Sequence, residues 1–153
     1  TEITFLQNET SGLFSTGEDV VSKLENSTEP YNEFFLMDAA GNDLAYDMLA
    51  ESGPHYMVII ADMTQLTREV FASMQPVLQE LENRQAHYFV VSGSSLGSLQ
   101  QMQDATGLHF SFFNSDAEVL GKIVETNTGM VVVQDGRVVA VYDEANFPVA
   151  EEL

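Results

Sequence analysis

Three short apolar runs, separated by segments of helical spacing, constrain the fold more than any other feature of this chain. The first run, residues 55–61, is apolar at almost every position, which is typical of a strand buried on both faces of a sheet. Strand-like runs return at residues 87–91 and 108–113. Because a helix that links two strands of one sheet returns the chain in the same direction, the three strands are predicted to be parallel.

The segment between the first two runs has a clear helical pattern. Its apolar residues lie three and four positions apart and share one face: Val70, Phe71, Met74, Val77, Leu78 and Leu81. Pro76 interrupts this pattern and predicts a kink. We expect the apolar face to cover the sheet near Val58 and Ile60, and the charged Glu69, Glu80 and Arg84 to point away from it.

Two hairpins are predicted to flank these alternating elements. Apolar residues 34–38 followed by Gly41 and Asn42, which both tolerate positive φ, predict an N-terminal β-hairpin. Asp135-Gly136 between two runs of β-branched residues predicts a closing hairpin. The closing hairpin adds antiparallel strands to the parallel ones. The fold class is therefore α/β, with three layers (α/β/α) around a mixed central sheet.

The chain divides into a folded domain and two flanking segments. We expect the domain at residues 34–148, an extension or linker at 1–33 and a tail at 149–153. The first segment is polar and weakly patterned, with Ile3, Phe5 and Leu13 as candidates for a short strand pair.

Charge and cysteine content exclude several classes of function. The chain holds 24 acidic and 5 basic residues, a formal charge of −19. We therefore expect no nucleic-acid partner and no direct docking on an anionic membrane, since both need a basic patch. A solubilising surface is the simpler interpretation, and a protein partner with a basic face is the alternative. With zero cysteines, disulfides, thiolate catalysis and thiolate metal sites are excluded, and no cofactor is predicted.

The ordered series of elements resembles the thioredoxin fold in its peroxiredoxin-like form. Four segments carry the likeness, none of them specific alone: the entry hairpin at 34–42, the central strand at 57–62, the active-site helix with its proline at 74–81, and the segment of the cis-proline and following hairpin at 126–136. The resemblance covers about residues 34–147. It implies a surface that binds extended peptides beside the catalytic loop.

The chain departs from that family where the family does its chemistry. By spacing from Pro76, the cysteine positions fall within residues 67–71, and the residues of this degenerate active-site region are Thr64, Thr67, Arg68, Phe71 and Thr128. Thr128 stands at the position of the cis-proline. A cis bond before a non-proline residue costs about 3 kcal/mol, so a trans bond is expected there. No catalytic residue and no redox activity are predicted.

A narrower resemblance concerns residues 114–129, 132–139 and 146–148. They look like the soluble C-terminal domain of DoxX-like membrane proteins of Bacteroides-type bacteria, in which a membrane bundle precedes a cysteine-poor thioredoxin-like domain. The likeness implies that Thr1 is an engineered start behind such a bundle, and that the protein is associated with a bacterial inner membrane. It also implies that the domain acts on a protein partner or on its own membrane domain.

His55, His87 and His109 each open a predicted strand, at one end of the sheet. Histidines on neighbouring strands could hold zinc or copper. However, ligands of open α/β sheets favour the carboxyl edge. Strands lie about 4.8 Å apart, so the outer two imidazoles would start about 10 Å apart. We therefore interpret the histidines as polar residues at strand starts, and predict no metal site.

The carboxyl edge is the predicted location of a ligand, if there is one. Asp62, Ser92, Ser94 and Asp116 follow the ends of the strands. Capping and turn formation explain these residue types without a ligand. The leading hypothesis is thus a non-catalytic interaction or regulatory module, and the alternative is a small-ligand binding domain or a cysteine-independent enzyme using this edge.

Overall fold

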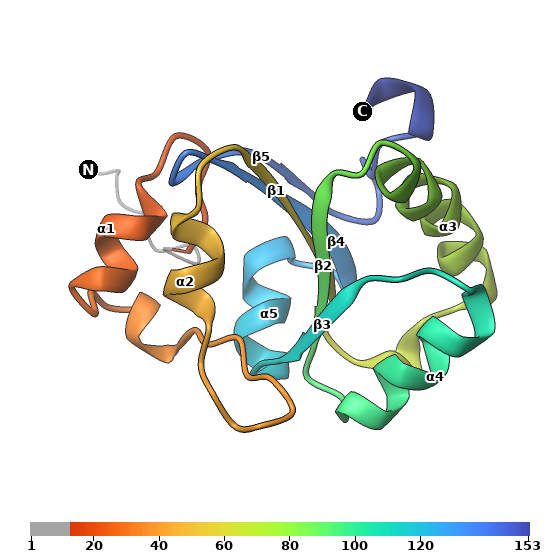
Figure 1. Ribbon diagram of the computed structural model, residues 1–153, viewed down its shortest axis with the longest axis horizontal. Coiled ribbons are helices and arrows are strands. Elements are labelled where there is room, and N and C mark those ends of the chain that lie inside the picture. Colours follow the sequence, from red (N-terminus) through yellow and green to blue (C-terminus); the bar gives the residue numbers. More distant parts are fainter. Residues whose placement is uncertain (1–12) are drawn as a thin grey trace, which may run out of the picture.

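A five-stranded mixed sheet in the order β3-β2-β1-β4-β5 runs through the centre of the molecule (Figure 1). The structure is a computed structural model, and it describes residues 13–153. The strands are β1 (Pro54–Ile60), β2 (His87–Ser92), β3 (Ser111–Asn114), β4 (Thr128–Gln134) and β5 (Arg137–Tyr142).

The strand directions agree with those predicted. β1 pairs in parallel with β2, and β2 with β3, whereas β4 is antiparallel to β1 and to β5. The helices α3 (Arg68–Asn83) and α4 (Leu96–Thr106) link the parallel strands, and α5 (Ala117–Val124) leads back to β4. The closing hairpin turns at Asp135 and Gly136, which both have positive φ.

The third strand is shorter than predicted, because the residues before it bond elsewhere. Leu108 N donates to Thr106 Oγ1, His109 N to Glu82 Oε1, and Phe110 O accepts from Gln103 Nε2 at 2.6 Å. Ladder pairing with β2 therefore begins only at Ser111. His109 lies before the strand and does not open it.

Helices cover both faces of the sheet, and successive residues of β1 alternate between two cores. Met57 and Ile59 join the core under α1 (Val20–Glu25), α2 (Ala45–Ala50) and α5. Val58 and Ile60 join the core under α3 and α4, which lie together on the other side (Figure 1). As predicted, α3 packs on the sheet through an apolar face; Met74, Val77, Leu78 and Leu81 are buried, Val70 and Phe71 partly so, and Pro76 lies within the helix. Truncating such buried side chains to alanine typically costs about 2–5 kcal/mol.

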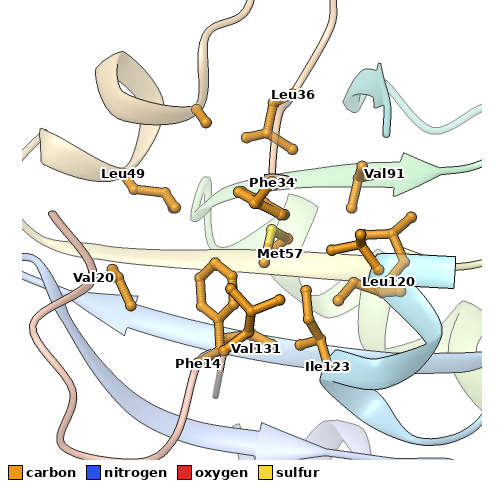
Figure 2. Close-up of a cluster of buried hydrophobic side chains, with 14 of the residues drawn as sticks. Phe14, Val20, Phe34, Leu36, Leu49, Met57, Val91, Leu120, Ile123 and Val131 are labelled. Carbon is orange, nitrogen blue, oxygen red and sulfur yellow. The ribbon is translucent and has the colours of Figure 1, made fainter. Parts of the chain in front are cut away.

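Residues 13–33 contribute to the first core. Figure 2 shows Phe14 and Val20 among residues from the sheet and from α5. The ring of Phe14 lies 5.4 Å from that of Tyr31 and 5.0 Å from that of Phe34. The Tyr31 hydroxyl donates to Glu18 at 2.6 Å and accepts from Phe14 N, and burial, aided by Glu18, raises the pKa of this phenol. The predicted strand pair involving Ile3 and Phe5 lies outside the described residues.

The predicted N-terminal hairpin is reduced to a tight turn. Met37 forms an isolated antiparallel bridge with Asp43 and another with Asn114 at the outer edge of β3. Extended pairing stops there because the Asp43 carboxylate accepts from both Leu36 N and Ala45 N. Within residues 13–153, no helix is long and apolar enough to cross a membrane.

Candidate functional site

The carboxyl edge begins just after β1, at Asp62. Asp62 caps the short 3-10 helix η4 (Met63–Gln65), since its Oδ1 accepts from both the hydroxyl and the backbone N of Thr64. The Thr64 hydroxyl and amide hold the pKa of the Asp62 carboxyl below its usual range. Both predicted residues, Asp62 and Thr64, thus lie together, and they close a turn.

Asn127, which sequence reasoning missed, locks this turn to the start of β4. Its Oδ1 accepts from Asp62 N at 2.9 Å, and its Nδ2 donates to Asp62 O at 3.0 Å. Its carbonyl accepts from Ala61 N at 2.7 Å. Asn127 therefore extends the β1–β4 pairing beyond the ladder through its side chain. The sequence around it, Thr126-Asn127-Thr128-Gly129, carries no specific signal of this role.

The end of β2 is bonded into the same region. Ser94 Oγ accepts from Met63 N at 2.9 Å, and Ser92 Oγ accepts from Ser94 N at 3.0 Å. Asn114 Nδ2 donates to the carbonyls of Ser92 and Ser94. A Cβ at Gly93 would overlap Ala117 of α5, so no space is left between the loop and that helix. Ser92 and Ser94 therefore act as turn residues.

Asp116 has the predicted capping role. Its Oδ1 accepts from Glu118 N and Val119 N at the start of α5. Beside it lies a cavity of about 420 Å³ whose lining includes Asp62, Gln65, Glu118, Glu125 and Asn127. A small ligand, as in the alternative hypothesis, would bind in this cavity. Asp62 Oδ1 and the side-chain Oδ1 and Nδ2 of Asn127 are already engaged in the bonds that close the loop.

Most residues of the degenerate active-site region have structural roles, as a helix cap, in the core or in strand pairing. Thr67 caps α3 by accepting from Val70 N at 3.1 Å, and Phe71 packs partly into the second core. Arg68 is exposed at the first turn of α3. Thr128 is fully buried and pairs with Ile60 of β1. The peptide bond before Thr128 is trans, as expected.

The backbone N and carbonyl of Thr128 are both hydrogen-bonded to side chains of nearby residues. Its N donates to Glu144 Oε2 at 3.1 Å, and its carbonyl accepts from Thr126 Oγ1 at 2.7 Å. Glu144 N in turn donates to Thr126 Oγ1. The Oγ1 of Thr128 and the Oγ of Ser115 are buried without a hydrogen-bond partner. The loop after β5 thus covers the start of β4.

A groove lies next to that loop, between α3 and the end of the chain. Its volume is about 430 Å³, and its lining is mostly apolar: Ala72, Ser73, Pro76, Glu144, Phe147, Pro148, Val149, Ala150 and Glu151. Val149 is 53 % exposed. Arg84, near the other end of α3, donates to the carbonyl of Leu153 at 2.9 Å and holds the last residues against the helix.

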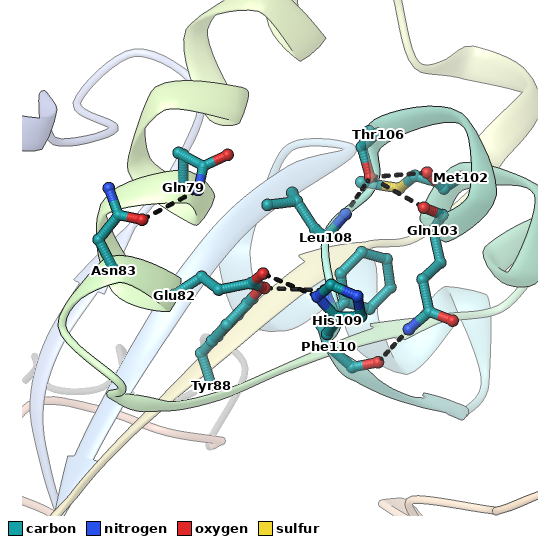
Figure 3. Close-up of polar contacts among 10 residues, drawn as sticks. All are labelled: Gln79, Glu82, Asn83, Tyr88, Met102, Gln103, Thr106, Leu108, His109 and Phe110. Atoms are coloured by element: carbon teal, nitrogen blue, oxygen red, sulfur yellow. Dashed lines mark hydrogen bonds and ion pairs between the residues drawn. The ribbon is translucent and has the colours of Figure 1, made fainter.

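At the amino edge of the sheet, the structure separates the three predicted histidines. His55 and His87 pair across β1 and β2, and their ring centroids lie 5.6 Å apart. His109 instead contacts Glu82 at the end of α3: its Nδ1 lies 3.1 Å from Glu82 Oε2, and its backbone N donates to Oε1 (Figure 3). His109 is therefore held by a carboxylate and lies outside the pair.

Tyr88 completes the contacts of Glu82, donating its hydroxyl to Oε1 at 2.6 Å (Figure 3). Burial of Glu82 raises its pKa, but the hydrogen bonds from Tyr88 and His109 outweigh this effect and leave the pKa below its usual range. Burial, together with the bond to Glu82, raises the pKa of Tyr88.

Glu51, a residue that sequence reasoning missed, joins the histidine pair. One carboxylate oxygen of Glu51 and one ring nitrogen each of His55 and His87 lie within 4.8 Å of one another. They line a cavity of about 240 Å³ between the end of α2 and the starts of β1 and β2. The spacing of Glu51 and His55 in the sequence gives no signal, because a helix end and a strand start separate them.

Comparisons with known proteins show the fold. No protein-family profile matches the sequence, and no curated protein matches it either. Among solved structures, a secreted disulfide oxidoreductase of Mycobacterium tuberculosis, homologous to E. coli DsbE, is 15 % identical with a TM-score of 0.58, over 78 % of this chain and 90 % of its own. A thioredoxin-like protein from Aeropyrum pernix is 10 % identical with a TM-score of 0.59, over 86 % and 91 %.

A third similar structure is a thiol:disulfide interchange protein from Bacteroides sp., with 10 % identity and a TM-score of 0.52, over 73 % of this chain and 80 % of its own. The chain therefore has a thioredoxin-like α/β fold, as the resemblance implied. At these identities the likeness extends to the fold alone.

Proposed function

We propose that this chain is a redox-inactive thioredoxin-like module that binds a protein partner. The observation that carries the proposal is a fold shared with thiol:disulfide oxidoreductases in a chain without any cysteine. Thiol–disulfide exchange needs a thiolate as the attacking group. What remains of such a domain without its thiolate is a binding surface.

The groove between α3 and the last residues is the proposed contact surface. Its lining includes Ala72, Pro76 and Val149, which offer apolar contacts to an extended segment. Glu144 and Glu151 line the same groove, in a chain of formal charge −19. We therefore assign to it an extended segment of a partner in which apolar and basic residues alternate, because charge complementarity favours such a sequence.

Membrane attachment is a second part of the proposal. The resemblance of residues 114–129 to DoxX-like proteins supports a membrane bundle before Thr1, in a bacterial inner membrane, and this bundle would offer the partner segment. The encoded sequence upstream of Thr1 tests the point. Several long apolar spans there support the proposal, and a start codon or a polar domain directly upstream contradicts it.

The binding proposal is tested with a short synthetic peptide in which lysine and valine alternate. In an NMR titration, we expect the largest shifts at the groove residues on α3 and at Val149. Val149→Lys should weaken binding about tenfold or more, because it removes an apolar contact and places a positive charge against the lysines of the peptide. Val139→Lys is the matched control, since Val139 on β5 is 48 % exposed and Val149 53 %.

Two results would contradict the surface assignment: equal affinity of both variants, or shifts that map elsewhere. An all-lysine peptide measures the contribution of charge alone. The redox part is tested separately, by insulin reduction and peroxide consumption. We expect neither to exceed the buffer rate, and turnover in a verified preparation would overturn this part.

A further inference from the structure

We propose that Glu51, His55 and His87 form a binding site for a divalent transition-metal ion, of which zinc is the reference case. This site lies at the amino edge of the sheet, away from the groove and from the degenerate active-site region, and it does not depend on the proposed function. It rests on the ligand atoms of the three residues, which lie within 4.8 Å of one another, and on the cavity of about 240 Å³ that they line.

The donor set fits the metal. Two imidazoles and one carboxylate are ligands that suit zinc and, among other divalent ions, copper and nickel. With zinc–ligand distances of about 2.0–2.1 Å, tetrahedral ligand atoms lie about 3.3 Å apart, so only a small closure is needed. Glu51 and His87 are exposed and free to make it. Three protein ligands leave one position for water or an external ligand.

His55 is held in place before any ion binds. Its side chain is 1 % exposed, and its Nε2 lies 2.8 Å from the carbonyl of Glu51. Because a carbonyl oxygen only accepts, Nε2 donates its N–H in this contact, and Nδ1 is the nitrogen left to bind an ion. Metal-binding histidines commonly donate their other N–H to a backbone carbonyl, which fixes the ring.

His109 provides an internal contrast within the same cavity. It also lines the cavity, but its Nδ1 faces the Glu82 carboxylate at 3.1 Å. Its backbone N is bonded to the same carboxylate. His109 is therefore a suitable control, equal in residue type and position in the cavity and different in its engagement.

The experiment is a calorimetric titration of the full chain with zinc chloride in the presence of excess magnesium. Magnesium prefers oxygen ligands and occupies the carboxylate-rich surface of this acidic chain, leaving imidazole sites to zinc. We expect one zinc ion per chain. His87→Gln and Glu51→Gln should each weaken binding about tenfold or more, and His109→Gln should not change it. His55 is left unchanged, since a substitution of this buried residue could prevent folding.

Long-range ¹H–¹⁵N spectra of the imidazoles provide a second measurement on the unaltered chain. Zinc should shift the ring nitrogens of His55 and His87 and leave those of His109 in place. The proposal is overturned by no zinc binding above magnesium, by unchanged affinity in His87→Gln, or by equal shifts of all three histidines.

Discussion

The two ends of the sheet use their polar side chains differently. At the carboxyl edge, Asp62, Ser94 and Asn127 bond to backbone groups of the loops that follow the strands. At the amino edge, His55 and His87 lie side by side, and one ligand atom each of these histidines and of Glu51 lie within 4.8 Å of one another. The polar side chains that a ligand would contact are thus hydrogen-bonded to loop backbone at the carboxyl edge. At the amino edge, they lie close together and retain atoms that could bind an ion.

This difference shows that polar residues at the carboxyl edge of the sheet do not by themselves identify a ligand-binding site. Helices and turns that start at a carboxyl edge leave backbone N–H groups unpaired, and short polar side chains satisfy them. In this chain Asp62, Thr67 and Asp116 are used in that way. A polar residue becomes a candidate ligand only when its atoms are not needed for the loop itself.

Among the changes that test this comparison, Asn127→Ala is expected to have the largest effect on stability. The change removes both side-chain bonds to the backbone of Asp62 and leaves a partly buried donor and acceptor without partners. We expect the free energy of unfolding to fall by about 2 kcal/mol. Urea unfolding followed by circular dichroism measures it.

Gln65→Ala is the control for Asn127→Ala. Gln65 is exposed and has only a long contact of 3.4 Å with Asp62. It should therefore change the free energy of unfolding by less than about 0.5 kcal/mol. If both variants lost the same amount, Asn127 would have no special role in closing the edge.

Thr128→Val tests the carboxyl edge with a change that should raise the free energy of unfolding. The Oγ1 of Thr128 is buried without a partner, and valine has nearly the same shape without the hydroxyl. Removing an unsatisfied buried polar group should raise the free energy of unfolding by about 1 kcal/mol. A loss of stability on urea unfolding would show that the hydroxyl is bonded in solution.

Glu82→Gln sharpens the contrast within the amino edge, where a carboxylate holds the ring of His109 and a backbone carbonyl holds that of His55. The pKa of Glu82 is lowered on folding, so its charge stabilises the fold above the ordinary glutamate range and this stabilisation is lost as the pH falls through the lower folded value. The wild type should therefore lose more stability than Glu82→Gln on acidification below about pH 4. Parallel unfolding midpoints of the two proteins between neutral and acid pH would contradict this account.

The smallest expected effect is that of salt at neutral pH. Self-repulsion at a formal charge of −19 is screened within about 10 Å at 0.1 M ionic strength. The unfolding midpoint should rise by a few degrees with moderate salt, and equally in the wild type and in Asn127→Ala, because hydrogen bonds of the edge are local. A midpoint that stays flat or falls would show that the acidic residues are locally paired.

Much of the fold could be predicted from the sequence, because local patterns determine it. The run before Asp62 and the helical face through Met74 and Leu78 correspond to β1 and α3 as expected. β3 was predicted too long, since hydrogen bonds of His109 and Phe110 to residues of other elements decide where it begins.

The candidate sites were predicted less well, because they depend on side chains that meet only in the folded chain. Asp62 and Asp116 were assigned to the correct edge, and their capping roles follow from residue type. Asn127 and Glu51 were not found, since their partners are distant in the sequence or across a change of element. The three histidines were taken as equivalent, and only tertiary contacts distinguish them.

The most direct test of the contrast between the edges is the unfolding midpoint of three proteins, each with and without zinc: wild type, Asn127→Ala and His87→Gln. We predict that Asn127→Ala has a lower midpoint in both conditions and keeps the rise that zinc produces in the wild type. His87→Gln should have the wild-type midpoint without zinc and lose the rise. The account is contradicted if His87→Gln is strongly destabilised without zinc, or if zinc raises its midpoint as much as that of the wild type.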